Sequence, residues 1–197
     1  MKKEEVINGV SMWTIWWLRE RKKKLKGIFA DSMTVNPFLI PILMDIHNLD
    51  SFEKLNDLNV LSHLMIGHYT GFGKLIDEKI LPNVFDTKKL DKTYRRSNPP
   101  LHLSCFDEID HVINRRSGQV ELLSLKASKW TIQLTMAVQL NKSFYEIIRK
   151  HGDHYSKIVV GVFYGKKETL TDKYDILRGI NRGASHDVVD LKKYVFV

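Results

Sequence analysis

Hydrophobic positions recur at helical spacing over the N-terminal part of the chain. In residues 3–26 the apolar side chains fall three or four positions apart, which is typical of an amphipathic helix. Residues 37–85 continue this pattern, and Ser51 is placed to cap a helix that begins just after it. Three glycines predict a break at 67–73. We therefore expect a helical N-terminal part.

The pattern changes to strand-like alternation in residues 107–129, DEIDHVINRRSGQVELLSLKASK, which a Ser-Gly pair at 117–118 interrupts. This is typical of a β-hairpin. The preceding residues, 86–104, are polar and basic and contain two prolines, so we expect an exposed loop there. The later segments predict a helix ending at Gly152, a buried strand in SKIVVGVFYG, a helix in TDKYDILRGINRG and a final strand in DVVDLKKYVFV.

The resulting order of elements is β-β-α-β-α-β, which indicates an α/β fold with a mixed β-sheet core flanked by helices. The length of 197 residues and the 43% hydrophobic content suit a single domain with a real core. We expect residues 1–70 to form its helical N-terminal part and residues 71–197 its α/β core.

The net charge and the number of cysteines limit the classes of function that the chain can have. The formal net charge of +8 favours a polyanionic partner such as nucleic acid, although a mildly basic soluble enzyme has the same charge. The single cysteine, Cys105, excludes an intramolecular disulfide framework and a zinc site built from cysteine pairs. The segment FLIPILMDI is too short to span a membrane, and the start lacks a signal-peptide pattern. These features predict a cytoplasmic protein with no membrane partner.

The hairpin carries the candidate chemistry. With a loop of odd length, Asp110 lies opposite Ser124, and Glu108 lies opposite Lys126. Because side chains alternate along a strand, these four share one face, while Glu121 points to the other. Carboxylates beside an amine can hold a divalent metal and orient a water. The same alternation also occurs on a half-solvated sheet, but a lysine in the core-like strand VELLSLKAS is costly without a partner.

The chain resembles type II restriction endonucleases of the PD-(D/E)XK superfamily and is similar to the PmeII-type group within it. The similar segments lie between about residues 70 and 185, and they are FGKLIDEKILPNVF, FDEIDHVI, ELLSLKASKWTIQLTMAVQLN, KIVVGVFYG and DILRGINRGA. The resemblance implies a restriction-endonuclease-like sheet core and Mg²⁺-dependent, sequence-specific hydrolysis of double-stranded DNA. It also implies a homodimer, in which two sites cut both strands.

The resemblance assigns roles residue by residue. Asp110 takes the position of the metal-binding aspartate, and Lys126 that of the motif lysine. Ser124 stands where the motif has an acidic residue, so a second metal carboxylate has to come from elsewhere. Glu78 on the preceding helix is preferred, because nucleases of this superfamily often bring a first-helix glutamate to the metal. Glu121 or Glu108 is the alternative.

The basic residues near the motif are candidates for DNA contacts, since arginine and lysine bind phosphates and base edges. The candidates are Arg95, Arg96, Arg115, Arg116, Lys129, Arg178, Asn181 and Arg182. Gln133, at the start of the next helix, is a further candidate for phosphate, or is an ordinary exposed glutamine.

Two alternatives to a restriction enzyme stay open. Ser124 is also what a catalytically inactive DNA-binding module would carry, and a structure-selective DNA repair nuclease uses the same fold. The eight histidines show no H-E-x-x-H motif and the chain has no P-loop, so a histidine-metal nuclease and nucleotide hydrolysis are not supported.

Overall fold

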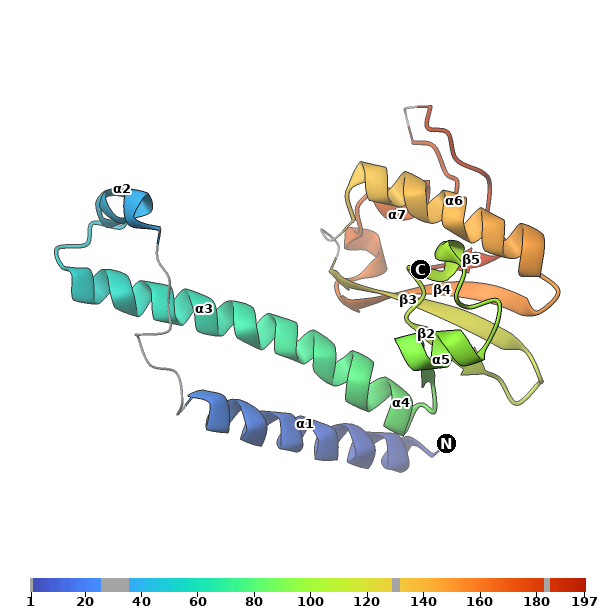
Figure 1. The fold of residues 1–197 in the computed structure, drawn as a ribbon, viewed down its shortest axis with the longest axis horizontal. Helices are drawn as coiled ribbons and strands as arrows, with labels where there is room; N and C mark the ends of the chain where they lie inside the picture. The colour runs from blue at the N-terminus through green and yellow to red at the C-terminus, as the bar shows by residue number, and fades with distance from the viewer. Residues whose placement is uncertain (1, 26–35, 129–131, 183–184) are drawn as a thin grey trace. The chain divides into compact units, whose positions relative to one another are not determined.

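The computed structural model of the protein describes residues 2–25, 36–128, 132–182 and 185–197. The chain divides into two compact units, Met1–Ile80 and Leu81–Val197 (Figure 1). The described part of the first unit is helical, and the second contains a mixed β-sheet. The predicted α/β class with a helical N-terminal part is therefore confirmed. The first unit extends beyond residue 70, where we expected the helical part to end.

The described residues of the first unit contain three α-helices: α1 (Lys3–Leu25), α2 (Ile40–Ile46) and α3 (Phe52–Leu75). A 3-10 turn at Pro37–Leu39 precedes α2, and a π-helical turn at Ile76–Ile80 follows α3. As the sequence predicted, Ser51 caps α3, and its Oγ accepts a hydrogen bond from the Lys54 N–H at 3.4 Å.

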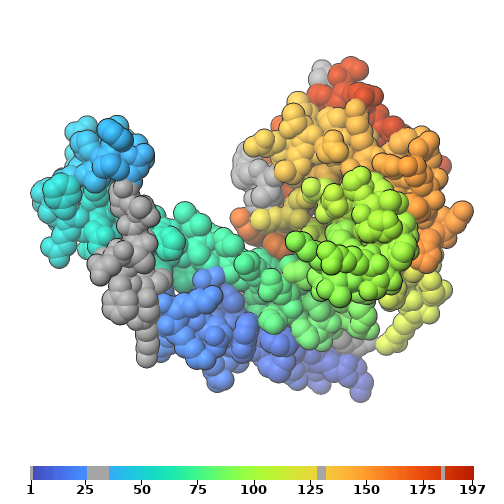
Figure 2. Space-filling view, in the orientation of Figure 1, coloured from blue at the N-terminus to red at the C-terminus, as the bar shows by residue number. Residues whose placement is uncertain are grey.

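The expected break at 67–73 is wrong, because α3 is continuous to Leu75. Helix α1 runs beside the second half of α3 (Figures 1 and 2). The Arg21 guanidinium donates to the carbonyl oxygen of Gly67, and a side chain at Gly71 would collide with that guanidinium. These glycines therefore allow close approach of a side chain to the helix backbone rather than interrupting the helix.

The second unit is built on an open five-stranded sheet whose spatial order follows the chain, β1-β2-β3-β4-β5. Strands β1, β2 and β3 pair antiparallel, and β3, β4 and β5 pair parallel. The bounds are β1 (Lys88–Lys89), β2 (His111–Asn114), β3 (Val120–Ser128), β4 (Tyr155–Tyr164) and β5 (Val195–Phe196). From β2 onwards, the predicted β-β-α-β-α-β order is confirmed.

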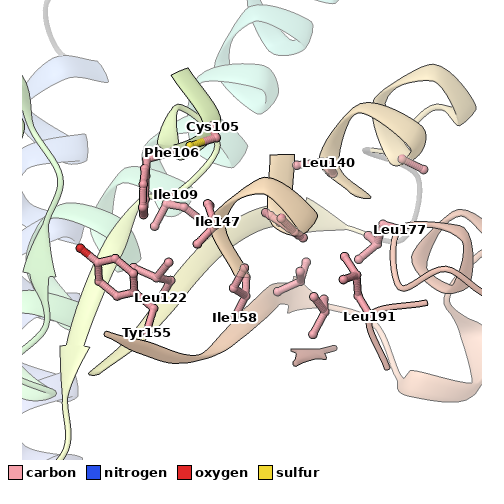
Figure 3. Close-up of a cluster of buried hydrophobic side chains, with 14 of the residues drawn as sticks. Cys105, Phe106, Ile109, Leu122, Leu140, Ile147, Tyr155, Ile158, Leu177 and Leu191 are labelled. Carbon is pink, nitrogen blue, oxygen red and sulfur yellow. The ribbon is translucent and has the colours of Figure 1, made fainter. Parts of the chain in front are cut away.

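The helices of this unit are α4 (Leu81–Val84), α5 (Lys92–Ser97), α6 (Leu134–His151) and α7 (Lys173–Ile176), with 3-10 turns at Ser104–Phe106 and Lys167–Thr169. Helix α6 makes the crossover between the parallel strands β3 and β4. Its fully buried Leu140 and Ile147 share a hydrophobic cluster with Leu122 of β3 and Ile158 of β4 (Figure 3). The face of β3 that carries Leu122 is therefore the core face.

Two local expectations are wrong. Residues 86–104 are not wholly an exposed loop, since they contain β1, α5 and the buried side chains of Leu90 and Leu101. The helix expected in TDKYDILRGINRG ends early. Gly179 adopts φ 85°, and the Ile180 N–H bonds back to the Asp175 carbonyl, which is a typical way to end a helix.

Candidate active site

The register of the hairpin is the one that the sequence predicted. His111 pairs with Leu123, and Asn114 pairs with Val120. Continued backward by one residue, this register places Asp110 beside Ser124. A hydrogen bond joins the two segments of the hairpin there, since the Asp110 N–H donates to the Leu123 carbonyl at 2.8 Å.

Asp110 is held at three points, directly before β2 begins. Besides its N–H bond to Leu123, its carbonyl oxygen accepts from the Leu90 N–H at 2.8 Å. Its side-chain Oδ2 accepts from the Leu125 N–H at 2.6 Å, on the part of β3 that extends beyond β2. A carboxylate has about four lone-pair sites, so each of its oxygens can accept more than one bond. The bond from Leu125 thus orients the Asp110 side chain.

Lys126 forms an ion pair with Glu108, with 2.8 Å between Nζ and Oε2. The lysine side chain is only 12% exposed, whereas the glutamate is 43% exposed. The ion pair with Glu108 offsets the free-energy cost of burying the lysine amine in a core-like strand. It also brings a second carboxylate to the end of the hairpin that holds Asp110.

Ser124 lies on the core face of β3, between Leu122 and Lys126. It is fully buried, and its Oγ has no hydrogen-bond partner among the residues that the structure describes. A buried hydroxyl without a partner is unfavourable and needs an explanation. Along this face the strand passes from an apolar residue to a hydroxyl and then to an amine, so the hydrophobic core ends at the candidate site.

Glu121 lies on the opposite face of β3, as the alternation predicted. Its side chain is 8% exposed and pairs with Arg115 at 2.6 Å and with Lys157 at 3.9 Å. The hydrogen bond to Glu121 raises the pKa of the Arg115 guanidinium. The structure therefore does not bring Glu121 together with Asp110, and Arg115 binds a carboxylate of the same hairpin.

Glu78 belongs to the first unit, in the π-helical turn after α3. Its side chain is exposed and lines a cavity of about 160 Å³ together with Trp16, Trp17, Lys74 and Lys79. Lys79 lies over the rings of Trp13 and Trp16. The expected role of Glu78 as a metal ligand stays a prediction.

The other candidates for DNA contact have different surroundings. Arg95 donates to four backbone carbonyls, whereas its neighbour Arg96 is exposed on the same helix. Arg178 and Arg182 both pair with Asp175, at 3.8 and 2.6 Å. The remaining candidates are simply placed: Arg116 and Asn181 are exposed, Gln133 is exposed at the start of α6, and Lys129 lies outside the described residues.

Two lysines directly after β4, Lys166 and Lys167, were not among the predicted site residues. A cavity of about 170 Å³ is lined by Val160, Val162, Lys166 and Lys167, among others. Val160 and Val162 of β4 pair in register with Ser124 and Lys126 of β3, so this cavity adjoins the core face of the site. The signal was present as GKK directly after a buried strand, because ligands of α/β proteins bind beyond the carboxyl ends of parallel strands.

Within the described ranges, no group of three or more histidine, cysteine, aspartate or glutamate side chains is arranged to hold a metal ion. In the same residues, no helix is long and apolar enough to cross a membrane. No protein-family model matches the chain, and no curated protein matches it.

Proposed function

We propose that the protein is a Mg²⁺-dependent endonuclease that cleaves double-stranded DNA at specific sequences, in the manner of a type II restriction enzyme. The observation that carries the proposal is the hairpin face with Asp110, Ser124 and the Lys126–Glu108 pair. The β-hairpin, the crossover helix and the following parallel strand also agree with the core that the PD-(D/E)XK resemblance implies.

The donor set fits Mg²⁺, which takes hard oxygen ligands and is usually bound by one or two carboxylates together with substrate phosphate and water. Asp110 is the first of these carboxylates. For the second we propose Glu108, because it reaches the same end of the hairpin, while Glu121 lies on the other face. Glu78 stays the alternative from the first unit.

When bound, Mg²⁺ would polarise the scissile phosphate and lower the pKa of a bound water. Asp110, fixed by the Leu125 N–H, would present its carboxylate in one orientation. Lys126 would orient the attacking water through its Nζ, or stabilise the negative charge that develops on the phosphate. Its low exposure strengthens this interaction, because charges act more strongly away from bulk water.

DNA binding is supported by charge. The chain carries 31 basic and 23 acidic residues, and Lys166 and Lys167 line the cavity beside the site. Lysines that neutralise phosphates provide affinity that does not depend on base sequence. We therefore place the phosphates that flank the cleaved bond near these two lysines.

We further propose a homodimer, because cutting both strands of a duplex requires two sites. The first unit exposes many large apolar side chains, as helices do before they pack against a partner. On α1 and α3 these include Ile7, Met12, Ile15, Leu18, Leu61, Met65, Ile66 and Tyr69. Sedimentation equilibrium tests this proposal, and a monomer at micromolar concentration contradicts it.

The deciding experiment is digestion of unmethylated phage DNA with Mg²⁺, comparing the wild-type protein with Asp110→Asn. Discrete bands from the wild type and intact DNA from the variant are expected. A smear from the wild type would point to cleavage without sequence specificity, and preferential cutting of branched DNA to a repair nuclease. Salt-sensitive DNA binding without cleavage in Mg²⁺ or Mn²⁺ would leave the inactive DNA-binding module.

A further inference from the structure

The guanidinium of Arg95 is surrounded by backbone carbonyls from the segment that leads into the hairpin. Its Nε donates to Leu90 at 3.0 Å, and its Nη1 donates to Leu101 at 3.1 Å and to Phe106 at 2.9 Å. Its Nη2 donates to Ile109 at 2.6 Å. Arginine has five N–H donors, and four of them are used here.

The four acceptors belong to buried residues, whose exposed fractions are 7% for Leu90, 4% for Leu101 and 0% for Phe106 and Ile109. A buried carbonyl without a donor is unfavourable, so Arg95 supplies partners that water does not. The side chains of Phe106 and Ile109 point into the hydrophobic cluster (Figure 3). The segment is thus fastened by apolar packing and by Arg95.

Two of the carbonyls that Arg95 binds belong to direct neighbours of Asp110, one in the chain and one across a backbone hydrogen bond. Ile109 precedes Asp110 in the chain and separates it from Glu108, and its carbonyl is bound by Nη2. Leu90 holds the Asp110 carbonyl through its N–H while its own carbonyl is bound by Nε. A shift of the guanidinium would therefore move the backbone that carries both carboxylates.

We propose that Arg95 is a positioning residue, which sets the places of Asp110 and Glu108 without touching DNA. The catalytic consequence rests on the proposed nuclease function, whereas the positioning itself does not. Only arginine meets the geometry, because a planar fork reaches several acceptors at fixed angles, while the lysine amine is a compact group on a flexible stem.

The test compares Arg95→Lys with the matched control Arg149→Lys, which makes the same change at an exposed side chain on α6. Hydrogen exchange is followed at the amides of Asp110 and Leu125, and at Ile158 in the core as a reference. Cleavage is measured at saturating DNA over a series of Mg²⁺ concentrations, and the KM for DNA is measured at two salt concentrations.

For Arg95→Lys we expect faster exchange at Asp110 and Leu125, unchanged exchange at Ile158, and an unchanged KM. The Mg²⁺ concentration for half-maximal rate should rise about tenfold or more, as is usual when the residues that orient metal ligands are changed. Arg149→Lys should change neither the exchange nor the Mg²⁺ dependence.

Each other outcome is decisive. Wild-type exchange at Asp110 and Leu125 in Arg95→Lys overturns the proposal, and so does equal acceleration at Ile158, which would mean a general loss of stability. A salt-dependent rise of KM in Arg95→Lys and not in the control, with wild-type exchange at the two site amides, would make Arg95 a phosphate contact instead. If the wild-type protein cleaves no DNA but exchange rises at the two site amides, the nuclease function fails and the positioning role stands.

Discussion

Lys126 and Glu108 are joined across the hairpin by an ion pair of 2.8 Å, although eighteen positions separate them in the chain. The amine is the less exposed of the two groups, so the carboxylate reaches inward from the solvent side. One oxygen of Glu108 therefore holds the proposed catalytic lysine, and the same carboxylate has a second oxygen to offer a metal.

Replacing Lys126 by methionine should abolish most cleavage and leave DNA binding in place. The methionine keeps the apolar stem but removes the charge, and the loss of such a group typically lowers kcat by about 10²–10³. Single-turnover cleavage and a binding titration measure the two effects separately. Lys142→Met, at an exposed ion pair on α6, is the control. Full cleavage by Lys126→Met would exclude the proposed role.

The second carboxylate can be identified by comparing Glu108→Gln with Glu121→Gln. Both remove one negative charge from the same hairpin, but on opposite faces. We expect only Glu108→Gln to raise the Mg²⁺ concentration that cleavage requires, because Glu108, unlike Glu121, is on the face of the hairpin that carries Asp110. The rate over a Mg²⁺ series is the measurement. If Glu78→Gln has this effect and Glu108→Gln does not, the first-helix glutamate is the ligand.

Ser124→Ala should make the protein more stable and a poorer enzyme. Removing a buried hydroxyl that lacks a partner should raise the free energy of unfolding by about 1 kcal/mol. Cleavage should fall if the Oγ binds water or substrate in the working site, as is common where stability is given up for activity. Urea unfolding and cleavage rates test both parts, with the exposed Ser156→Ala as control. A less stable Ser124→Ala would show that the Oγ does have a partner.

Stability should decrease in alkaline solution. Burial raises the pKa of the Cys105 thiol above its ordinary 9.0, and burial also raises the pKa of the Tyr155 hydroxyl above its ordinary 10.0. Both groups keep their protons to higher pH in the folded state than in the unfolded chain. Their contribution is therefore complete below the ordinary values and is lost as pH rises through the folded ones.

Thermal unfolding between pH 8 and pH 11 measures this effect, because the midpoint should fall from about pH 9 upward as the unfolded thiol and then the unfolded phenol ionise. Tyr155→Phe should flatten the decline above pH 10, since phenylalanine has no proton to lose. An equally steep decline in that variant would assign the effect to other groups.

The pair Lys166 and Lys167 should contribute to DNA affinity and not to the chemical step. Changing both to alanine should weaken binding and reduce the slope of log K against log salt by about one to two, since each phosphate contact contributes about 0.9. The rate at saturating DNA should stay near that of the wild type. Lys192 and Lys193, which are exposed and do not line the cavity, provide a matched double variant.

The hairpin was predictable because its determinants are local. The alternation of side chains has a period of two, and the length of the turn sets which residues face each other, so the partners of Asp110 and Lys126 followed from counting. The helices of the first unit and the order of strands β2 to β5 along the chain likewise followed from short-range periodicity, whereas β1 was not predicted. The glycines at 67–73 led to the wrong prediction of a helix break. In sequence, a glycine that ends a helix cannot be distinguished from one that makes room for a side chain such as Arg21.

The sequence by itself determined the mixed α/β class, the register of the hairpin and the face that Asp110, Ser124 and Lys126 share. Only the tertiary structure decided that Glu121 pairs with Arg115 and that Arg95 binds carbonyls in its own chain. The acceptors of Arg95 lie 5 to 14 positions away along an irregular segment. No periodicity brings such groups together, because their meeting depends on how the segment packs against the core.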